Sequence, residues 1–182
     1  MTIEKRLQQF YIDNNLPNNG GVDKNTFRLK VFGINWKFPN PQFRKDIVHI
    51  HDIQHILNDC DTSWKGETYI SGWELSTGMW KHFPVCLFSF WAAGYGVWMY
   101  PKALFTGYKK GVNDIGIIDI KLNKSDFMKM TLDQLKDLVS KKEKTTFGMV
   151  QWLQFLFWLL ISEILFLTPF VIGIILIISL IK

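Results

Sequence analysis

A short histidine motif is the part of the chain that most clearly predicts chemistry. It reads His-Asp-Ile-Gln-His over residues 51–55, and eleven residues separate its end from Glu67. On a helix, His51 and His55 lie one turn apart on the same face, with Asp52 beside them. Mixed imidazole and carboxylate ligands suit Zn²⁺ and other divalent ions. The sequence therefore predicts one divalent metal ion, with zinc as the leading candidate. Its four predicted ligands are His51, Asp52, His55 and Glu67.

Two other residues near this motif have open roles. Cys60 lies between the two halves of the motif and is either a stray ligand or, as we favour, a small loop residue. Glu74 follows Glu67 at i+7 on one helix face, where it is either a partner of the ligands or a solvated carboxylate. The alternative for the histidines themselves is a polar helix face without a metal, because His-x-x-x-His recurs by chance.

The elements that must position these residues are predicted to be helices. One helix is expected from about Gln42 to Leu57, and a second from Lys65 to Ser76 with Thr62 or Ser63 as its N-cap. Further predicted elements are a short helix over 1–12, a short extended segment over 27–38 and a capping box at 131–134. The predicted fold class is therefore all-α.

Two apolar stretches follow. Residues 83–101 contain no charged side chain, but Pro84, Gly94 and Gly96 interrupt them, which favours a core helix or an interfacial helix over a membrane span. Between residues 147 and 181 the only ionisable side chain is Glu163, which is either functional or placed at interface depth. This second stretch predicts at least one transmembrane helix, because a span requires about 20 residues.

The second stretch has two possible topologies. One is a helical hairpin over 147–167 and 170–181, broken at Pro169. The other is an interfacial helix that leads into one span over about 164–181. The preceding Lys141, Lys142 and Lys144 favour a soluble part on the cytoplasmic side. We thus predict a helical metal-binding domain at 1–143 and a membrane-anchoring segment at 144–182.

Charge indicates the kind of partner. The formal net charge of the chain is +5, and the basic residues are scattered rather than gathered in the stripe that nucleic-acid binding requires. We therefore expect no nucleic-acid partner. A mild basic excess suits an anionic membrane surface instead.

The motif and its flanks resemble the coenzyme Q biosynthesis protein four family of the ubiquinone pathway. The resemblance covers about residues 44–140. Its main element is His-Asp-x-x-His followed after eleven residues by Glu. The supporting segments are Thr-Ser-Trp-Lys-Gly-Glu at 62–67, Trp-Glu-Leu at 73–75, Ala-Leu-Phe-Thr-Gly-Tyr-Lys-Lys at 103–110 and Met-Thr-Leu-Asp-Gln-Leu at 130–135. The apolar C-terminal stretch is not part of the family pattern.

The resemblance implies a membrane-associated metal-binding protein of ubiquinone or related isoprenoid-quinone biosynthesis. It implies action on a prenylated aromatic head group, as in a metal-dependent decarboxylase of a hydroxybenzoate-type precursor, within a quinone-biosynthesis complex. A groove lined by Trp64, Trp73 and Phe83 would admit that lipid, unless these aromatics are core packing. The alternatives are a lipid-binding scaffold with a structural metal and, more weakly, a metallohydrolase, whose motif carries Glu where this chain has Asp52.

Overall fold

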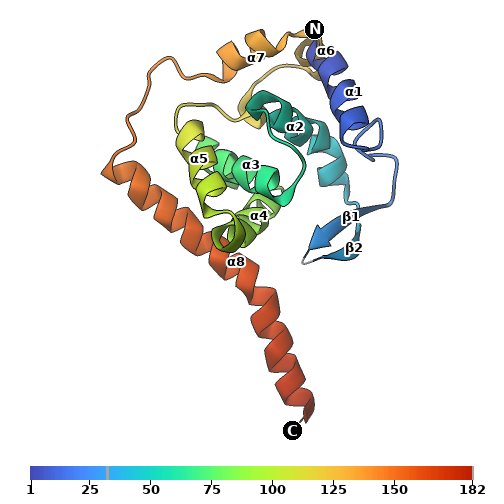
Figure 1. The fold of residues 1–182 in the computed structure, drawn as a ribbon, viewed down its shortest axis with the longest axis vertical. Coiled ribbons are helices and arrows are strands. Elements are labelled where there is room, and N and C mark those ends of the chain that lie inside the picture. The colour runs from blue at the N-terminus through green and yellow to red at the C-terminus, as the bar shows by residue number, and fades with distance from the viewer. Residues whose placement is uncertain (32, 182) are drawn as a thin grey trace. The chain divides into compact units, whose positions relative to one another are not determined.

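Helices make up most of the chain in the computed structural model, which describes residues 1–31 and 33–181 (Figure 1). Contacts divide it into two compact units. Unit 1 comprises residues 1–61 and 117–138, and unit 2 comprises residues 62–116 and 139–182. The predicted all-α fold class is confirmed in that the described chain is mostly helical, with one two-stranded sheet besides. The predicted boundary at residue 143 stays a prediction.

Unit 1 is built around the helix that carries the histidine motif. Its elements are α1 (Ile3–Asp13), β1 (Thr26–Val31), β2 (Ile34–Pro39), α2 (Gln42–Asn58), η2 (Ile117–Asp119), α6 (Lys124–Lys129) and most of α7 (Leu132–Val139). The amide of Ile3 donates to the Met130 carbonyl at 2.7 Å, which ties the start of α1 to the segment before α7. Buried apolar side chains fill this unit, among them Ile3, Leu7, Val48, Ile53, Phe127 and Leu135.

Local signals in the sequence set the ends of several helices. Ser63 caps α3 (Trp64–Thr77), with its Oγ accepting from the amide of Gly66 at 3.3 Å. Thr131 and Gln134 form the predicted capping box, with reciprocal hydrogen bonds of 2.8 and 3.3 Å. The predicted extended segment is an antiparallel hairpin, in which Phe27 pairs with Phe38. These predictions are confirmed, and the two caps depend on neighbouring residues alone.

Unit 2 is a helical bundle. Besides α3 it contains η1 (Met79–Lys81), α4 (Cys86–Met99), α5 (Pro101–Gly111) and α8 (Met149–Ile181). Helices α3 and α5 approach closely at two glycines. A Cβ on Gly72 would collide with the Leu104 carbonyl, and one on Gly107 would collide with the Tyr69 carbonyl. Trp73 is fully buried in this contact, and its indole N–H donates to Asp114 Oδ2 at 2.8 Å. Trp73 is therefore core packing and not a groove wall.

Helix α8 corrects one prediction. Residues 149–181 form one continuous helix with Pro169 inside it, so of the two predicted topologies the helical hairpin is wrong. The Thr168 hydroxyl donates to the Ile164 carbonyl at 2.6 Å, next to the place where proline removes a backbone donor. Within the described chain, α8 is the helix long and apolar enough to cross a membrane, and only 6% of its most apolar window is buried. Helix α4, with 14 residues, is too short to do so.

Candidate metal centre

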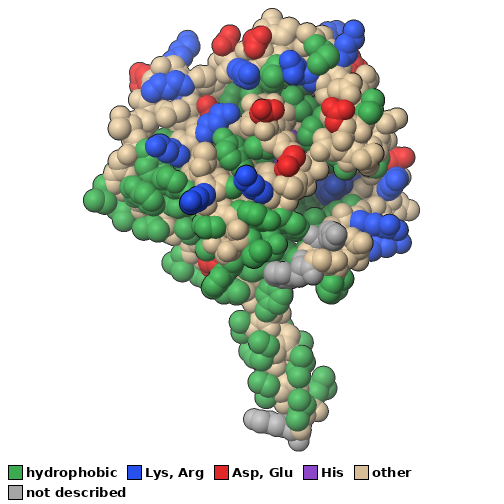
Figure 2. All heavy atoms as spheres, viewed as in Figure 1, with side chains coloured by type: hydrophobic (Ala, Val, Ile, Leu, Met, Phe, Trp, Pro, Cys, Tyr) green, Lys and Arg blue, Asp and Glu red, His purple; other side chains and the backbone are tan. Residues whose placement is uncertain are grey.

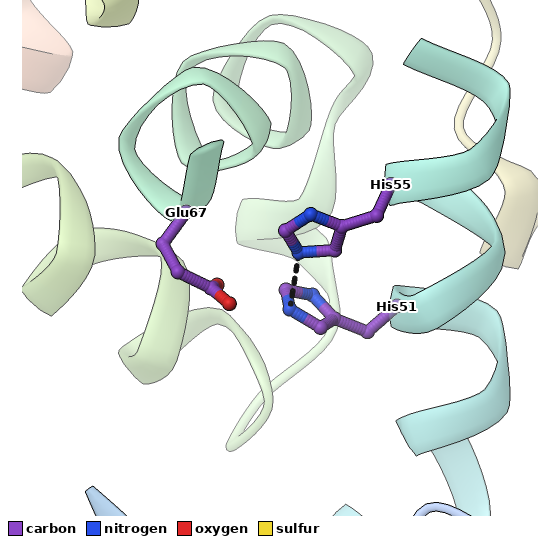
Figure 3. Close-up of side chains that lie close together, drawn as sticks. All are labelled: His51, His55 and Glu67. Carbon is purple, nitrogen blue, oxygen red and sulfur yellow. Dashed lines mark hydrogen bonds between the residues drawn. The ribbon is translucent and has the colours of Figure 1, made fainter. Parts of the chain in front are cut away.

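The two histidines of the motif come together on α2. His51 and His55 are one turn apart, with ring centroids separated by 4.9 Å and ring planes at 76°. Their Nε2 atoms lie 3.3 Å apart (Figure 3). Two nitrogens on one tetrahedral zinc ion, each at about 2.0–2.1 Å, are about 3.3 Å from one another. The pair therefore has the spacing either of two ligands of one ion or of a ring-to-ring hydrogen bond.

The surroundings hold one of these rings in place. His55 is 1% exposed. The ring of Phe10, on α1, lies 5.9 Å from the His55 ring. His51 is half-buried, so the pair is accessible from the His51 side. An imidazole fixed by packing is a better preorganised ligand than one on a free surface.

Glu67 is the third residue of the group. It lies in the first turn of α3, where a carboxylate also interacts favourably with the helix dipole. Together with His51 and His55 it forms a group that could hold a metal ion, in which one ligand atom from each residue lies within 4.8 Å of the others. Because Glu67 belongs to unit 2, the histidine pair is the part of the group whose geometry is fixed within one unit.

Asp52 has a different environment. It is 7% exposed and lies beside the Tyr11 hydroxyl of α1. Burial, together with the charge of Asp52 and a hydrogen bond to it, raises the pKa of Tyr11. Gly20 completes this corner, since a Cβ on it would lie 3.3 Å from Asp52 Oδ2. Among the described residues, the structure thus brings three of the four predicted ligands together and places Asp52 against Tyr11.

Helix geometry separates Asp52 from His51 but leaves it only about 60° from His55, so the packing of α1 decides where its side chain lies. Residues four apart on an α-helix differ by about 40° around the axis, whereas adjacent residues differ by about 100°. His51 and His55 therefore share a direction, and Asp52 is turned away from His51. The Tyr11 contact could not be found from the motif, because it depends on the packing of α1.

The other acidic and thiol candidates can now be placed. Glu74 is 4% exposed, and its carboxylate accepts from the Ser89 hydroxyl at 2.5 Å, so the solvated alternative is wrong. Cys60 lies in the loop after α2, with its Sγ 3.5 Å from the Asn58 carbonyl oxygen, and it is not in the metal-ligand group. Sequence reasoning also passed over His49, whose pKa is lowered to about 4 by burial and by the charge of Lys124.

No family model matches the sequence, and the comparisons with curated proteins and with solved structures give no match. The fold and site therefore define a mostly helical chain with a His-His-Glu group and a long apolar C-terminal helix.

Proposed function

We propose that this protein is a membrane-anchored metalloprotein of ubiquinone or related isoprenoid-quinone biosynthesis. Its substrate in this proposal is a prenylated aromatic head group. The observation that carries the proposal is the His51, His55 and Glu67 group, whose ligand atoms lie within 4.8 Å of one another. The sequence around the group supports the pathway through its resemblance to the coenzyme Q biosynthesis protein four family.

The metal in this proposal is zinc, held by His51, His55 and Glu67. The histidine nitrogens already have the spacing that one ion requires. Ligand atoms of a tetrahedral ion are about 3.3 Å apart, and the three ligand atoms of this group lie within 4.8 Å of one another. When bound, the metal supplies a Lewis acid that polarises an oxygen of the substrate.

Three ligands favour a catalytic site over a structural one. Structural zinc is enclosed by four protein ligands, whereas catalytic zinc has three and keeps one position open. With Asp52 held against Tyr11, the described part of the chain offers three in this group. In this proposal Asp52 positions α2 on α1, and the open position receives the head group, as in a metal-dependent decarboxylase.

The apolar helix α8 fits a lipid substrate. A polyprenyl chain stays in the bilayer, so an anchored protein meets it at a high effective concentration. Lys141, Lys142 and Lys144 precede α8, and by the positive-inside rule they favour a cytoplasmic location for the rest of the chain. A complex with other quinone-biosynthesis proteins is part of the proposal.

The test combines metal content with quinone content. Full-length protein is purified in detergent as wild type, His51→Ala, His55→Ala and Glu67→Gln. His49→Ala is the matched control, because His49 is on the same helix and outside the group. We expect about one zinc per chain in the wild type and in the control, and strong loss in the other three variants.

The same variants are then expressed in cells that lack the gene. We expect low quinone levels, restored by the wild type and by His49→Ala but not by His51→Ala. Unchanged quinone levels in the deletion strain would remove the pathway. Rescue by His51→Ala would show that the metal has no role in it.

A further inference from the structure

We propose that the exposed face of α4 lies in the lipid bilayer at the level of the head groups, beside the point where α8 enters the hydrocarbon core. Unit 2 would then bind the membrane through two helices, α8, which spans it, and α4, which lies in its surface. This inference rests on the proposed membrane anchoring by α8.

The length of α8 exceeds what a bilayer can enclose. Its 33 residues extend about 50 Å at about 1.5 Å per residue, whereas the hydrocarbon core is about 30 Å thick. A tilt large enough to enclose the whole helix would exceed the upper limit of about 40° seen for transmembrane helices. Part of α8 must therefore lie outside the hydrocarbon.

The side chains of α8 indicate which part spans. After Phe170 the helix contains no aromatic residue and is almost entirely aliphatic, and Figure 2 shows hydrophobic side chains along its projecting part. Both of its tryptophans, Trp152 and Trp158, are in the N-terminal third. Tryptophan prefers the boundary between head groups and hydrocarbon. Counting about 20 residues back from Ile181 places the boundary near Ser162.

Helix α4 crosses α8 at this boundary. A Cβ on Gly94 would lie 2.5 Å from Phe166 Cβ and 2.9 Å from the Ser162 carbonyl oxygen, so the two backbones are close there. The Trp98 indole N–H donates to Glu163 Oε2 at 3.0 Å. A tryptophan–carboxylate hydrogen bond suits the polar level of the boundary and would be costly deeper in the membrane.

The outward face of α4 has the composition of a membrane-surface element. Its first turn exposes Leu87 and Phe88, each at 43%, and its last turn exposes Trp98 at 67% and Met99 at 52%. No charged residue occurs from 83 to 101, while Lys81 and Lys102 flank the stretch. Basic residues at both ends of an apolar face match an anionic head-group layer. This apolar face continues directly from α8, so lipid is the occupant that fits it.

The experiment measures the depth of single labelled positions in the full chain, reconstituted in phosphatidylcholine vesicles. Cys60 is replaced by Ser, and the buried Cys86 stays in place and is controlled by the protein without an added cysteine. A polarity-sensitive fluorophore is attached at Phe88→Cys or Met99→Cys on α4. Ile174→Cys marks the span, and Lys109→Cys in the last turn of α5 marks the aqueous side. Circular dichroism verifies that each labelled chain remains helical.

We expect blue-shifted emission at residues 88 and 99, with strong quenching by lipids that carry a spin label near the head group. Residue 174 should be quenched by labels deep in the acyl chain, and residue 109 by neither. If residues 88 and 99 behave like residue 109 while residue 174 is quenched, α8 spans and the inference about α4 is wrong. If residue 174 also behaves like residue 109, the proposed anchoring fails, and the inference fails with it.

Discussion

The proposed metal binding by α2 and the proposed membrane anchoring by α8 depend on their sequences in different ways. On α2, two histidines at i and i+4 place two nitrogen atoms 3.3 Å apart, and each atom is essential to the proposed metal site. On α8, the property that counts is the summed apolarity of many side chains, most of them exposed. Metal binding depends on the positions of individual atoms and should be lost with one substitution. Membrane insertion depends on the overall composition of α8 and should tolerate several substitutions.

The largest effect is expected at the metal ligands. His51→Ala or Glu67→Gln should weaken zinc binding by more than about 100-fold, because even loss of a group that only supports a ligand costs about 10–100-fold. A titration against a competing chelator measures the affinity. An affinity that stays within about 10-fold of the wild type would show that the residue is not a ligand.

An intermediate effect is expected at the contact between α8 and α4, where the size of a single side chain matters. Gly94→Leu should lower the free energy of unfolding by about 1–3 kcal/mol, since its side chain would collide with Phe166 and the Ser162 carbonyl. The matched control is Gly173→Leu, because a Cβ there has nothing within 4 Å. Unfolding in detergent micelles measures both. Equal stabilities would mean that the α4–α8 contact is absent.

A similar effect is expected from Tyr11→Phe. Asp52 is buried beside the Tyr11 hydroxyl, and loss of a hydrogen bond to a charged group costs about 1.5–3 kcal/mol. Denaturant unfolding measures this, and zinc content should stay at the wild-type level. The companion Asp52→Asn should also retain zinc. If the Asp52→Asn protein lost its zinc, Asp52 would be a fourth ligand, as the sequence first predicted.

The last prediction concerns the dependence of stability on pH. The pKa of His49 is lowered to about 4 in the folded chain, below its value of about 6.5 in an unfolded chain. Between these values the unfolded state binds more protons, so stability falls as the pH falls from about 6.5 toward 4. His49→Gln should make the urea midpoint less dependent on pH over this window. An identical pH dependence in both proteins would show that His49 does not cause the loss of stability at low pH.

The parts of the fold that sequence reasoning found are those set by neighbouring residues. The ends of α2 and α3, the Ser63 cap and the capping box at Thr131 depend on residues within one turn. The pairing of His51 with His55 follows from helix spacing alone. The place of Asp52 could not be found this way, because it depends on α1, about forty residues earlier in the chain.

The hairpin alternative, with its break at Pro169, is wrong for a different reason. A proline in a water-exposed helix leaves a carbonyl without a backbone donor, which favours a break. In an apolar segment a break would leave more groups unpaired, and side-chain hydroxyls can substitute for the missing bond. Pro169 leaves the Leu165 carbonyl without its backbone donor, and the Thr168 hydroxyl donates to the adjacent Ile164 carbonyl. The apolar composition of α8 therefore outweighed the tendency of proline to break a helix.

The most direct test of the metal centre is the X-ray absorption fine structure of the zinc-loaded full-length protein. We predict two imidazole nitrogens at about 2.0–2.1 Å, with oxygen completing the set and no sulfur. His55→Ala should remove one imidazole or the metal altogether, and His49→Ala should leave the spectrum unchanged. A sulfur at about 2.3 Å, which Cys60 would supply, or a zinc ion without two imidazoles would contradict the account.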